Sequence, residues 1–295
     1  MTITKIRDLA NDRNIHLQNL HDGDLWAINS GFDNLDRKTG KFRSGDLVVI
    51  GARPVMGRST FAENLVYNIA KHNDPHHNVL FFSMETPSAT IVDKFAAKIS
   101  DIDPWKLRVG MLKDADIKSL EQATAEIAKL PILVDDTTHF TMPEFVARIH
   151  KTISEQALNE DLGAVVIDHL DLLLPYDRTS ADYEQKLDEV THGLRDLARE
   201  LEIPIILMLE LPRYINEGDP TPTLPILKPY GSLERDASII IFLHRPSYYD
   251  TSRLDYPDAQ TTELIIRKNL HGPIKTVKIR FDPDKLKFVS LDDNA

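Results

Sequence analysis

One stretch of the sequence has the residue types and spacing of a phosphate-binding loop. An apolar run ends at Ala52, the segment 53–60 (RPVMGRST) follows, and a helical pattern begins after it. A strand, a glycine-containing loop and a helix in this order place backbone N–H donors where an anion binds. In the usual pattern G-x-x-x-x-G-K-[ST], Gly57 and Ser59 match, whereas Ala52 and Arg58 replace the first glycine and the lysine. A tight strand-to-helix turn is the alternative interpretation.

Short apolar runs and longer amphipathic stretches alternate along most of the chain. This order predicts an α/β fold with a parallel sheet covered by helices. Strands are expected at 46–52, 78–83, 131–135, 164–168, 203–209 and 239–243. Helices are expected at 60–71, 88–99, 115–130, 142–156 and 183–201. Three further strands, at 261–267, 276–281 and 287–289, predict a mixed or antiparallel edge at the end of the chain.

Two segments depart from this alternation. The segment 212–230 contains five prolines and little periodicity, which predicts a long loop, and long loops in compact domains are often functional. Residues 1–28 are expected to form a separate helical arm before the main domain.

The composition limits the classes of function. The 295 residues carry a formal net charge of −11 and include no cysteine, which excludes disulfides and thiolate chemistry. The eleven histidines lack ligand spacing with acidic residues, so a zinc site is not expected. The chain has neither a membrane-length apolar run nor the apolar core of a signal peptide, so a cytoplasmic location is expected. The acidic balance argues against wholesale nucleic-acid binding, although not against a local basic patch.

A series of short motifs resembles, in order, the C-terminal RecA-like motor domain of the DnaB-type replicative DNA helicases. The motifs are 30–37 (SGFDNLDR), 44–47 (SGDL), 52–57 (ARPVMG), 80–85 (LFFSME), 132–137 (ILVDDT), 165–170 (VVIDHL), 194–204 (LRDLARELEIP), 230–237 (YGSLERDA) and 272–277 (GPIKTV). The resemblance implies a RecA-like P-loop NTPase, with a mostly parallel twisted sheet flanked by helices and a C-terminal antiparallel edge. It also implies an arm at 1–28, an ATPase domain at 29–290 and a tail at 291–295.

The resemblance implies ATP and Mg²⁺ as cofactors and assigns residues to them. ATP would lie on the loop residues Ala52, Pro54, Met56, Gly57, Arg58, Ser59 and Thr60. Ser59 and, indirectly, Asp168 would serve Mg²⁺, Arg58 would keep the positive charge, and Glu85 would polarise the attacking water. The alternatives are a capping aspartate at the end of a strand for Asp168 and a first-turn helix glutamate, favoured by the helix dipole, for Glu85.

The resemblance also assigns a DNA-binding loop and a terminal hairpin. Lys228, Tyr230 and Gly231 match the loop that touches single-stranded DNA, where Tyr230 could stack on a base. A plain loop tyrosine is the alternative for Tyr230. Lys268 matches a hairpin lysine beside the nucleotide, whereas Leu270 stands where the helicases have an arginine finger, and Arg267 is close enough in sequence to substitute for it.

The chain departs from the helicase pattern at four positions of the nucleotide site. They are Arg58 for the loop lysine, Asp171 for a glutamine after the fourth strand, Glu210 in the Ser-Gln-Leu motif after the fifth, and Leu270 in the hairpin. A carboxylate facing a phosphate is repulsive unless a cation intervenes. These departures make nucleotide binding easier to retain than hydrolysis.

Two functions of different classes remain open at this point. The first is an ATP-hydrolysing DNA translocase that binds single-stranded DNA as a homo-oligomeric ring. The second is a degenerate paralogue that binds nucleotide or a replicative helicase and regulates replication. A KaiC-like or RadA-like relative is a third reading that fits the fold but not the local motifs. The short stretch before the motor leaves no room for a collar domain, and 3–20 is either a remnant of the linker helix or a frayed terminus.

Overall fold

A computed structural model describes residues 5–7, 27–158, 161–173, 183–213, 220–249 and 260–291. Its strands are β1 (Ala27–Ile28), β2 (Phe42–Arg43), β3 (Leu47–Ala52), β4 (Asn78–Ser83), β5 (Ile132–Asp135), β6 (Leu162–Asp168), β7 (Ile205–Glu210), β8 (Ile239–His244), β9 (Thr261–Asn269), β10 (Thr276–Asp282) and β11 (Lys287–Ser290). Its α-helices are α2 (Asp33–Thr39), α3 (Arg58–His72), α4 (Ser88–Ser100), α5 (Pro104–Val109), α6 (Asp114–Ile127), α7 (Met142–Glu155), α8 (Tyr183–Leu201), α9 (Leu233–Asp236) and α10 (Pro246–Tyr249). Two 3₁₀ helices are η1 (Leu170–Leu173) and η2 (Leu224–Tyr230).

Nine of these strands form one sheet in the order β11-β10-β9-β8-β3-β7-β6-β4-β5. The pairs among β3 to β8 are all parallel, and β9, β10 and β11 are antiparallel. This arrangement confirms the predicted parallel sheet with an antiparallel C-terminal edge. The predicted strands and long helices are all present, with ends shifted by a few residues at most.

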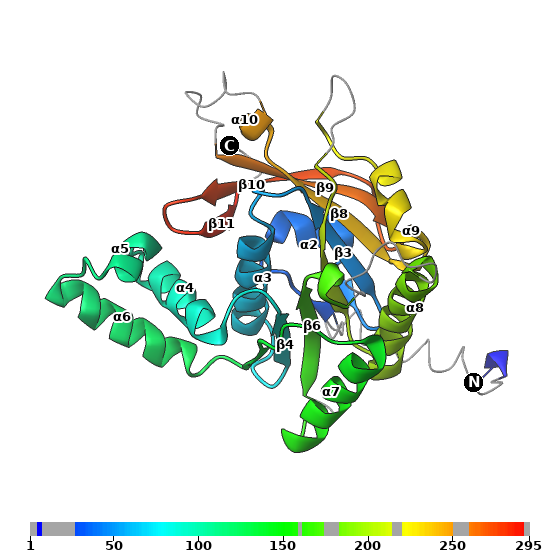
Figure 1. Ribbon diagram of the computed structural model, residues 1–295, viewed down its shortest axis with the longest axis horizontal. Coiled ribbons are helices and arrows are strands. Elements are labelled where there is room, and N and C mark those ends of the chain that lie inside the picture. Colours follow the sequence, from blue (N-terminus) through cyan, green and yellow to red (C-terminus); the bar gives the residue numbers. More distant parts are fainter. Residues whose placement is uncertain are drawn as a thin grey trace.

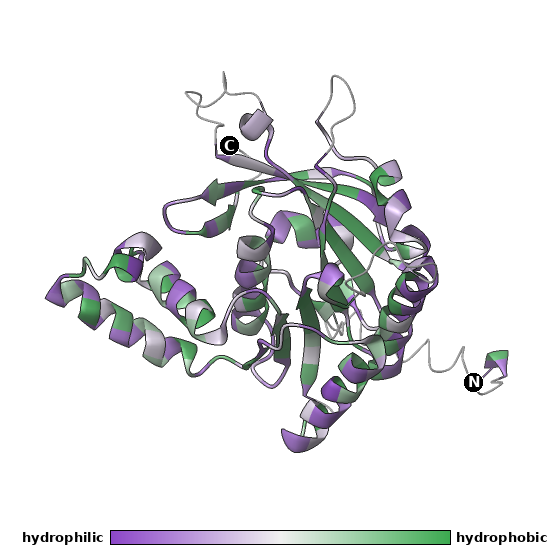
Figure 2. Cartoon of the chain, in the orientation of Figure 1, coloured by the Kyte–Doolittle hydropathy of each residue, from purple (hydrophilic) through white to green (hydrophobic). Residues whose placement is uncertain are grey.

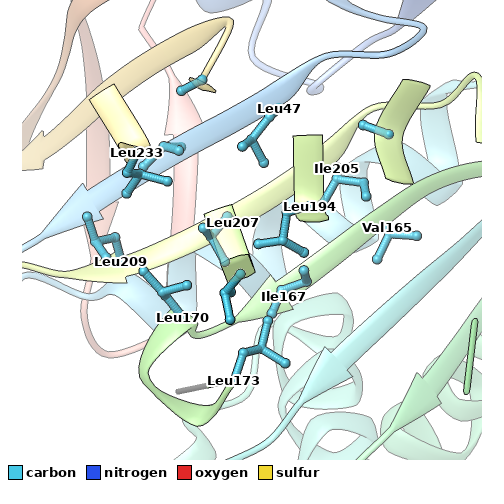
Figure 3. Close-up of a cluster of buried hydrophobic side chains, with 14 of the residues drawn as sticks. Leu47, Val165, Ile167, Leu170, Leu173, Leu194, Ile205, Leu207, Leu209 and Leu233 are labelled. Atoms are coloured by element: carbon cyan, nitrogen blue, oxygen red, sulfur yellow. The ribbon is translucent and has the colours of Figure 1, made fainter. Parts of the chain in front are cut away.

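Helices cover both faces of the sheet (Figure 1). One apolar core joins the sheet to α7, α8 and α9, and Figure 3 shows part of it, with Leu194 of α8 and Leu233 of α9 packed on Leu47, Leu207 and Ile167. The second core joins the other face to α2, α3 and the start of α4. The central parallel strands are apolar along most of their length, whereas the outer helices alternate polar and apolar residues (Figure 2). This two-sided burial accounts for the continuous apolar runs in the sequence.

Helices α4, α5 and α6 form a lobe that projects from the sheet (Figure 1). Among its side chains, Trp105, Val109, Met111 and Ile117 are large, apolar and exposed. In the part of the chain that the structure describes, no helix is long and apolar enough to cross a bilayer.

The structure adds elements that the sequence patterns did not predict. Helices α2, α5, α9 and α10 and the β1–β2 pair are too short to show a periodicity. The segment 212–230, predicted to be a loop, ends in η2, and its residues 214–219 lie outside the described part of the chain. Most of the predicted arm at 1–28 and of the tail at 291–295 also lies outside it.

Candidate nucleotide site

The loop between β3 and α3 has a backbone that fits an anion. Gly57 precedes α3 with φ 94°, a left-handed conformation that suits glycine. A Cβ at this position would also approach the Phe288 ring to 3.3 Å. The first helical bond joins the Phe61 amide to the Gly57 carbonyl at 2.8 Å. The amides of the first turn therefore have no intrahelical acceptor and can donate to a phosphate.

Helix α3 begins at Arg58, two residues before the predicted start at 60. Arg58, Ser59 and Thr60 thus form its first turn instead of continuing the loop. Of the other predicted nucleotide residues, Ala52 and Met56 are buried, and Pro54 is partly exposed. Because Ala52 and Met56 have no exposed side chain, they can serve a nucleotide only through their backbone.

The strand order brings three carboxylates to the edge of the sheet that carries this loop. Strands β7, β6 and β4 follow β3 in the sheet and run parallel to it. Glu210 ends β7 level with Ala52, Asp168 ends β6, and Glu85 follows the end of β4. Ligands of open α/β sheets bind outside the carboxyl ends of the strands. Asp168 and Glu85 therefore lie near the ends of neighbouring strands, at the sheet edge that carries the loop.

Arg58 connects these three strand ends through its side chain. Its Nε donates to Oδ1 of Asp168 at 3.1 Å, Nη1 to Oε2 of Glu210 at 2.9 Å and Nη2 to Oε2 of Glu85 at 3.3 Å. The planar guanidinium presents its N–H donors in a fixed fork and reaches three separate acceptors. The ammonium of a lysine is a single point charge and has no such fork. Arg58, Asp168, Glu85 and Glu210 are called the carboxylate cluster below.

The carboxylate cluster is buried on one side and open on the other. The side chains of Arg58 and Asp168 are 9% and 3% exposed, whereas those of Glu85 and Glu210 are 51% and 42% exposed. Three carboxylates face one guanidinium, so the cluster carries an excess of negative charge. The sequence identified Arg58 and Glu210 as separate departures, and the structure shows that they are partners.

His169 is a member of the site that the sequence analysis missed. Its Nδ1 lies 3.0 Å from Nη2 of Arg58, and because a guanidinium only donates, Nδ1 is the acceptor. Its Nε2 lies 3.5 Å from Oδ2 of Asp171. The only signal in the sequence was its position directly after Asp168. Asp171, one of the predicted departures, therefore contacts the site through His169.

A second buried carboxylate lies behind the cluster on α3. Glu63 is 3% exposed and accepts from Nζ of Lys94 on α4 at 2.6 Å. Burial raises the pKa of Glu63, and Lys94 opposes that shift. This pair joins α3 to the lobe.

The predicted DNA loop contains one contradiction. Tyr230 is 8% exposed, lies in the core under α8 and donates its hydroxyl to the Glu210 carbonyl. The prediction that its ring stacks on a base is therefore wrong for this conformation, because apolar packing covers the ring. Lys228 is exposed, and Gly231 is exposed with φ 56°. A Cβ on Gly231 would lie 2.6 Å from Oδ1 of Asp188, which requires glycine there.

Two cations of the terminal hairpin, Lys268 and Arg267, bind carbonyls of the chain itself. Nζ of Lys268 donates to the carbonyls of Glu234 at 2.7 Å and Arg235 at 3.0 Å. Nε of Arg267 donates to the Pro222 carbonyl at 3.3 Å. Leu270 is 66% exposed. The hairpin therefore presents an apolar side chain where the helicase pattern has an arginine finger.

Comparison with known proteins identifies the family. A family model described as the DnaB-like helicase C terminal domain matches residues 27–290. The replicative DNA helicase DnaB of Geobacillus stearothermophilus is 32% identical over 280 residues, which are 95% of this chain and 60% of that protein. The replicative DNA helicase DnaC of Bacillus subtilis is 31% identical over 290 residues, 97% of this chain and 62% of that protein. The chain thus spans about three fifths of the length of these relatives.

Solved structures agree with this result. The ATPase domain of G40P has a TM-score of 0.88 and 26% identity, with 99% of this chain and 100% of that chain covered. A DnaB-like replicative helicase, described with its interactions with primase, has a TM-score of 0.81 and 28% identity, with 90% and 64% covered. A KaiC-like protein of Pyrococcus horikoshii, at 17% identity and a TM-score of 0.57, shares the RecA-like fold alone. The chain belongs to the family of DnaB-like helicase C-terminal domains.

Proposed function

We propose that this chain is the motor domain of a replicative DNA helicase, which binds and hydrolyses ATP and moves along single-stranded DNA. The observation that carries the proposal is the junction of β3 and α3. There the amides of the first helical turn lie at the same sheet edge as the carboxylates of β4, β6 and β7. This is the arrangement in which P-loop proteins hold a nucleoside triphosphate.

The phosphates of ATP would lie on the amides of Gly57, Arg58, Ser59 and Thr60. Mg²⁺, when bound, would neutralise phosphate charge, with the Ser59 hydroxyl and the Asp168 carboxylate as its nearest protein donors. In the described segments no group of three metal-ligating side chains is present. Mg²⁺ keeps several waters and uses few carboxylates, so two protein donors are enough for the proposed role.

Glu85 is the proposed base for the attacking water. Arg58 holds one of its carboxylate oxygens at 3.3 Å, and the side chain is half exposed, so water can reach it. Arg58 in turn is held by Asp168 and Glu210. The position of Glu85 thus depends on the whole carboxylate cluster.

The proposed DNA contact and assembly follow from charge and from the family. Lys228 is the exposed cation of the DNA loop, and Gly231 allows the turn beside it. Lys268 is proposed to approach the nucleotide of a neighbouring copy in a ring, which requires it to leave the carbonyls of α9.

Turnover of ATP with and without single-stranded DNA tests the proposal. The native chain is expected to hydrolyse ATP faster with DNA, and Glu85→Gln is expected to lower the rate by about 100-fold or more, the usual contribution of a general base. Glu121→Gln, an exposed glutamate of α6, is the matched control and is expected to leave the rate unchanged. Equal rates for the native chain and Glu85→Gln would contradict the role of Glu85.

A second candidate function is a nucleotide-binding subunit that regulates a helicase without turnover. Two observations favour it: Arg58 is fully engaged by carboxylates, and Leu270 replaces the arginine finger. Nucleotide binding without turnover would support this candidate. Turnover that appears only in the Arg58→Lys, Leu270→Arg double variant would show that the scaffold is a motor with a modified site.

A further inference from the structure

We propose that Glu210 is a specificity-determining residue that makes the nucleotide site favour a nucleoside diphosphate over a nucleoside triphosphate. The inference rests on the proposed function, because it requires a nucleotide on the first turn of α3. It concerns the residue that ends β7, where the resemblance to the helicases predicts a neutral glutamine.

The geometry limits where a third phosphate can lie. Arg58 is the first residue of α3, and its side chain reaches from the helix start to the ends of β4, β6 and β7. A phosphate held by the amides of Gly57–Thr60 therefore has the Arg58 side chain between it and the strand ends. The next phosphate outward must lie on the open side of the carboxylate cluster, which Glu85 and Glu210 line with half-exposed side chains.

The cation that would attract this phosphate is already occupied. All three nitrogens of Arg58 donate to carboxylates, and Nη2 also donates to His169. Arg58 can bind a phosphate oxygen only by giving up one of these acceptors. Its contact with Glu210, at 2.9 Å, is the shortest of the three ion pairs. Glu210 therefore opposes the third phosphate twice, by its own charge and by holding Arg58.

Glu210 is the carboxylate of the cluster with no proposed role as a Mg²⁺ donor or as the base. Asp168 is the proposed donor to Mg²⁺, and Glu85 is the proposed base. Glu210 instead borders a cleft of about 350 Å³, together with Asp171, Arg213 and Tyr230. Its neutral isostere keeps the shape of the side chain and could still accept from Arg58. The Glu210→Gln variant therefore separates charge from packing.

Calorimetric titration with ADP and with ATP, both in the presence of Mg²⁺, tests the proposal. We expect the native chain to bind ADP about tenfold more tightly than ATP, the size of one moderate charge repulsion at a partly exposed site. Glu210→Gln is expected to bring the two affinities within about threefold of each other, mainly through tighter ATP binding. Glu210→Asp, which keeps the charge, and Glu121→Gln, the distant control, are expected to keep the native ratio.

The outcomes separate this inference from the proposed function. Thermal unfolding of each variant is recorded first, so that a folding defect is not read as lost binding. Native affinities that are equal for ADP and ATP, or a ratio that does not change in Glu210→Gln, would overturn the role of Glu210 and leave the nucleotide site standing. Failure of both nucleotides to bind the native chain and all variants would overturn the proposed function as well.

Discussion

Two buried cations lie at helix α3, Arg58 on the helix itself and Lys98 on the neighbouring α4, and they have different partners. Arg58 begins the helix, is 9% exposed, and has an acceptor on every nitrogen. Lys98 on α4 is 7% exposed, and its Nζ has no hydrogen-bond acceptor among the described residues. Its Nζ lies 4.5 Å from the centroid of the Tyr67 ring of α3. The two side chains are buried to a similar extent. They differ in their partners, which are carboxylates around Arg58 and the Tyr67 ring beside Lys98.

The comparison shows how this family member tolerates an arginine in its phosphate loop. A buried charge costs less free energy where carboxylates surround it than where they do not. Burial lowers the pKa of Lys98 to about 7, and Lys287 adds to the shift. Arg58 and Glu210 replace two residues of the helicase pattern at once and contact each other. The residues at these two departures are therefore direct partners.

Removal of Arg58 is the change with the largest expected effect on stability. Arg58→Ala leaves the buried Asp168 beside Glu85 and Glu210 without a cation. We expect the free energy of unfolding to fall by about 2–3 kcal/mol, less than for a fully buried pair because two of the carboxylates are half exposed. Urea titration of the variant and the native chain measures the loss.

A matched double variant sharpens this result. In Arg58→Ala, Glu210→Gln one of the three carboxylates is removed together with the cation, so we expect a smaller loss than in Arg58→Ala alone. Losses that simply add in the double variant would contradict the coupling of the two residues.

The contribution of Lys98 to stability should depend on pH. The pKa of Lys98 is lowered from 10.5 to about 7 in the folded chain, so between pH 7 and 10.5 the unfolded chain binds more protons. Stability is therefore expected to rise with pH through this window, by about 2–3 kcal/mol between pH 6 and 9. Lys98→Met has no such group, and urea titrations at both pH values should show that this part of the rise is absent. A rise of equal size in the variant would contradict the assignment to Lys98.

Lys268 is an intermediate case, with the smallest expected effect. It is partly buried, burial lowers its pKa, and its Nζ donates to two backbone carbonyls instead of carboxylates. Lys268→Met should cost about 1 kcal/mol, the net contribution of such hydrogen bonds. The control Lys275→Met changes an exposed lysine on the same hairpin and should stay within about 0.5 kcal/mol of the native chain. Equal losses for the two variants would show that the carbonyl contacts contribute nothing.

The sequence predicted most of the fold because burial on both faces leaves a clear pattern. The apolar runs that became β3, β4, β6 and β7 are long enough to be recognised without knowledge of their neighbours. The short helix α2 (Asp33–Thr39) was missed because seven residues show little periodicity. The first turn of α3 was also missed, because Arg58 and Ser59 match the phosphate-loop motif and were therefore assigned to the loop.

The contacts within the site could not be predicted from the sequence. Motif matches pointed to Gly57, Asp168 and Glu85, and their roles toward a nucleotide stay predictions, whereas no motif assigned a role to His169. The pairing of Arg58 with Glu210 joins positions 152 residues apart, and only the strand order β3-β7-β6-β4 brings them together. Tyr230 was misjudged because a loop motif gives no information about the core that covers it.

The most direct test of the central claim is a crystal structure of the chain with ADP and Mg²⁺. The account predicts the diphosphate on the amides of Gly57–Thr60, with Arg58 still within hydrogen-bond distance of Asp168 and Glu210. A nucleotide bound elsewhere on the chain, or Arg58 released from both carboxylates onto the diphosphate, would contradict it.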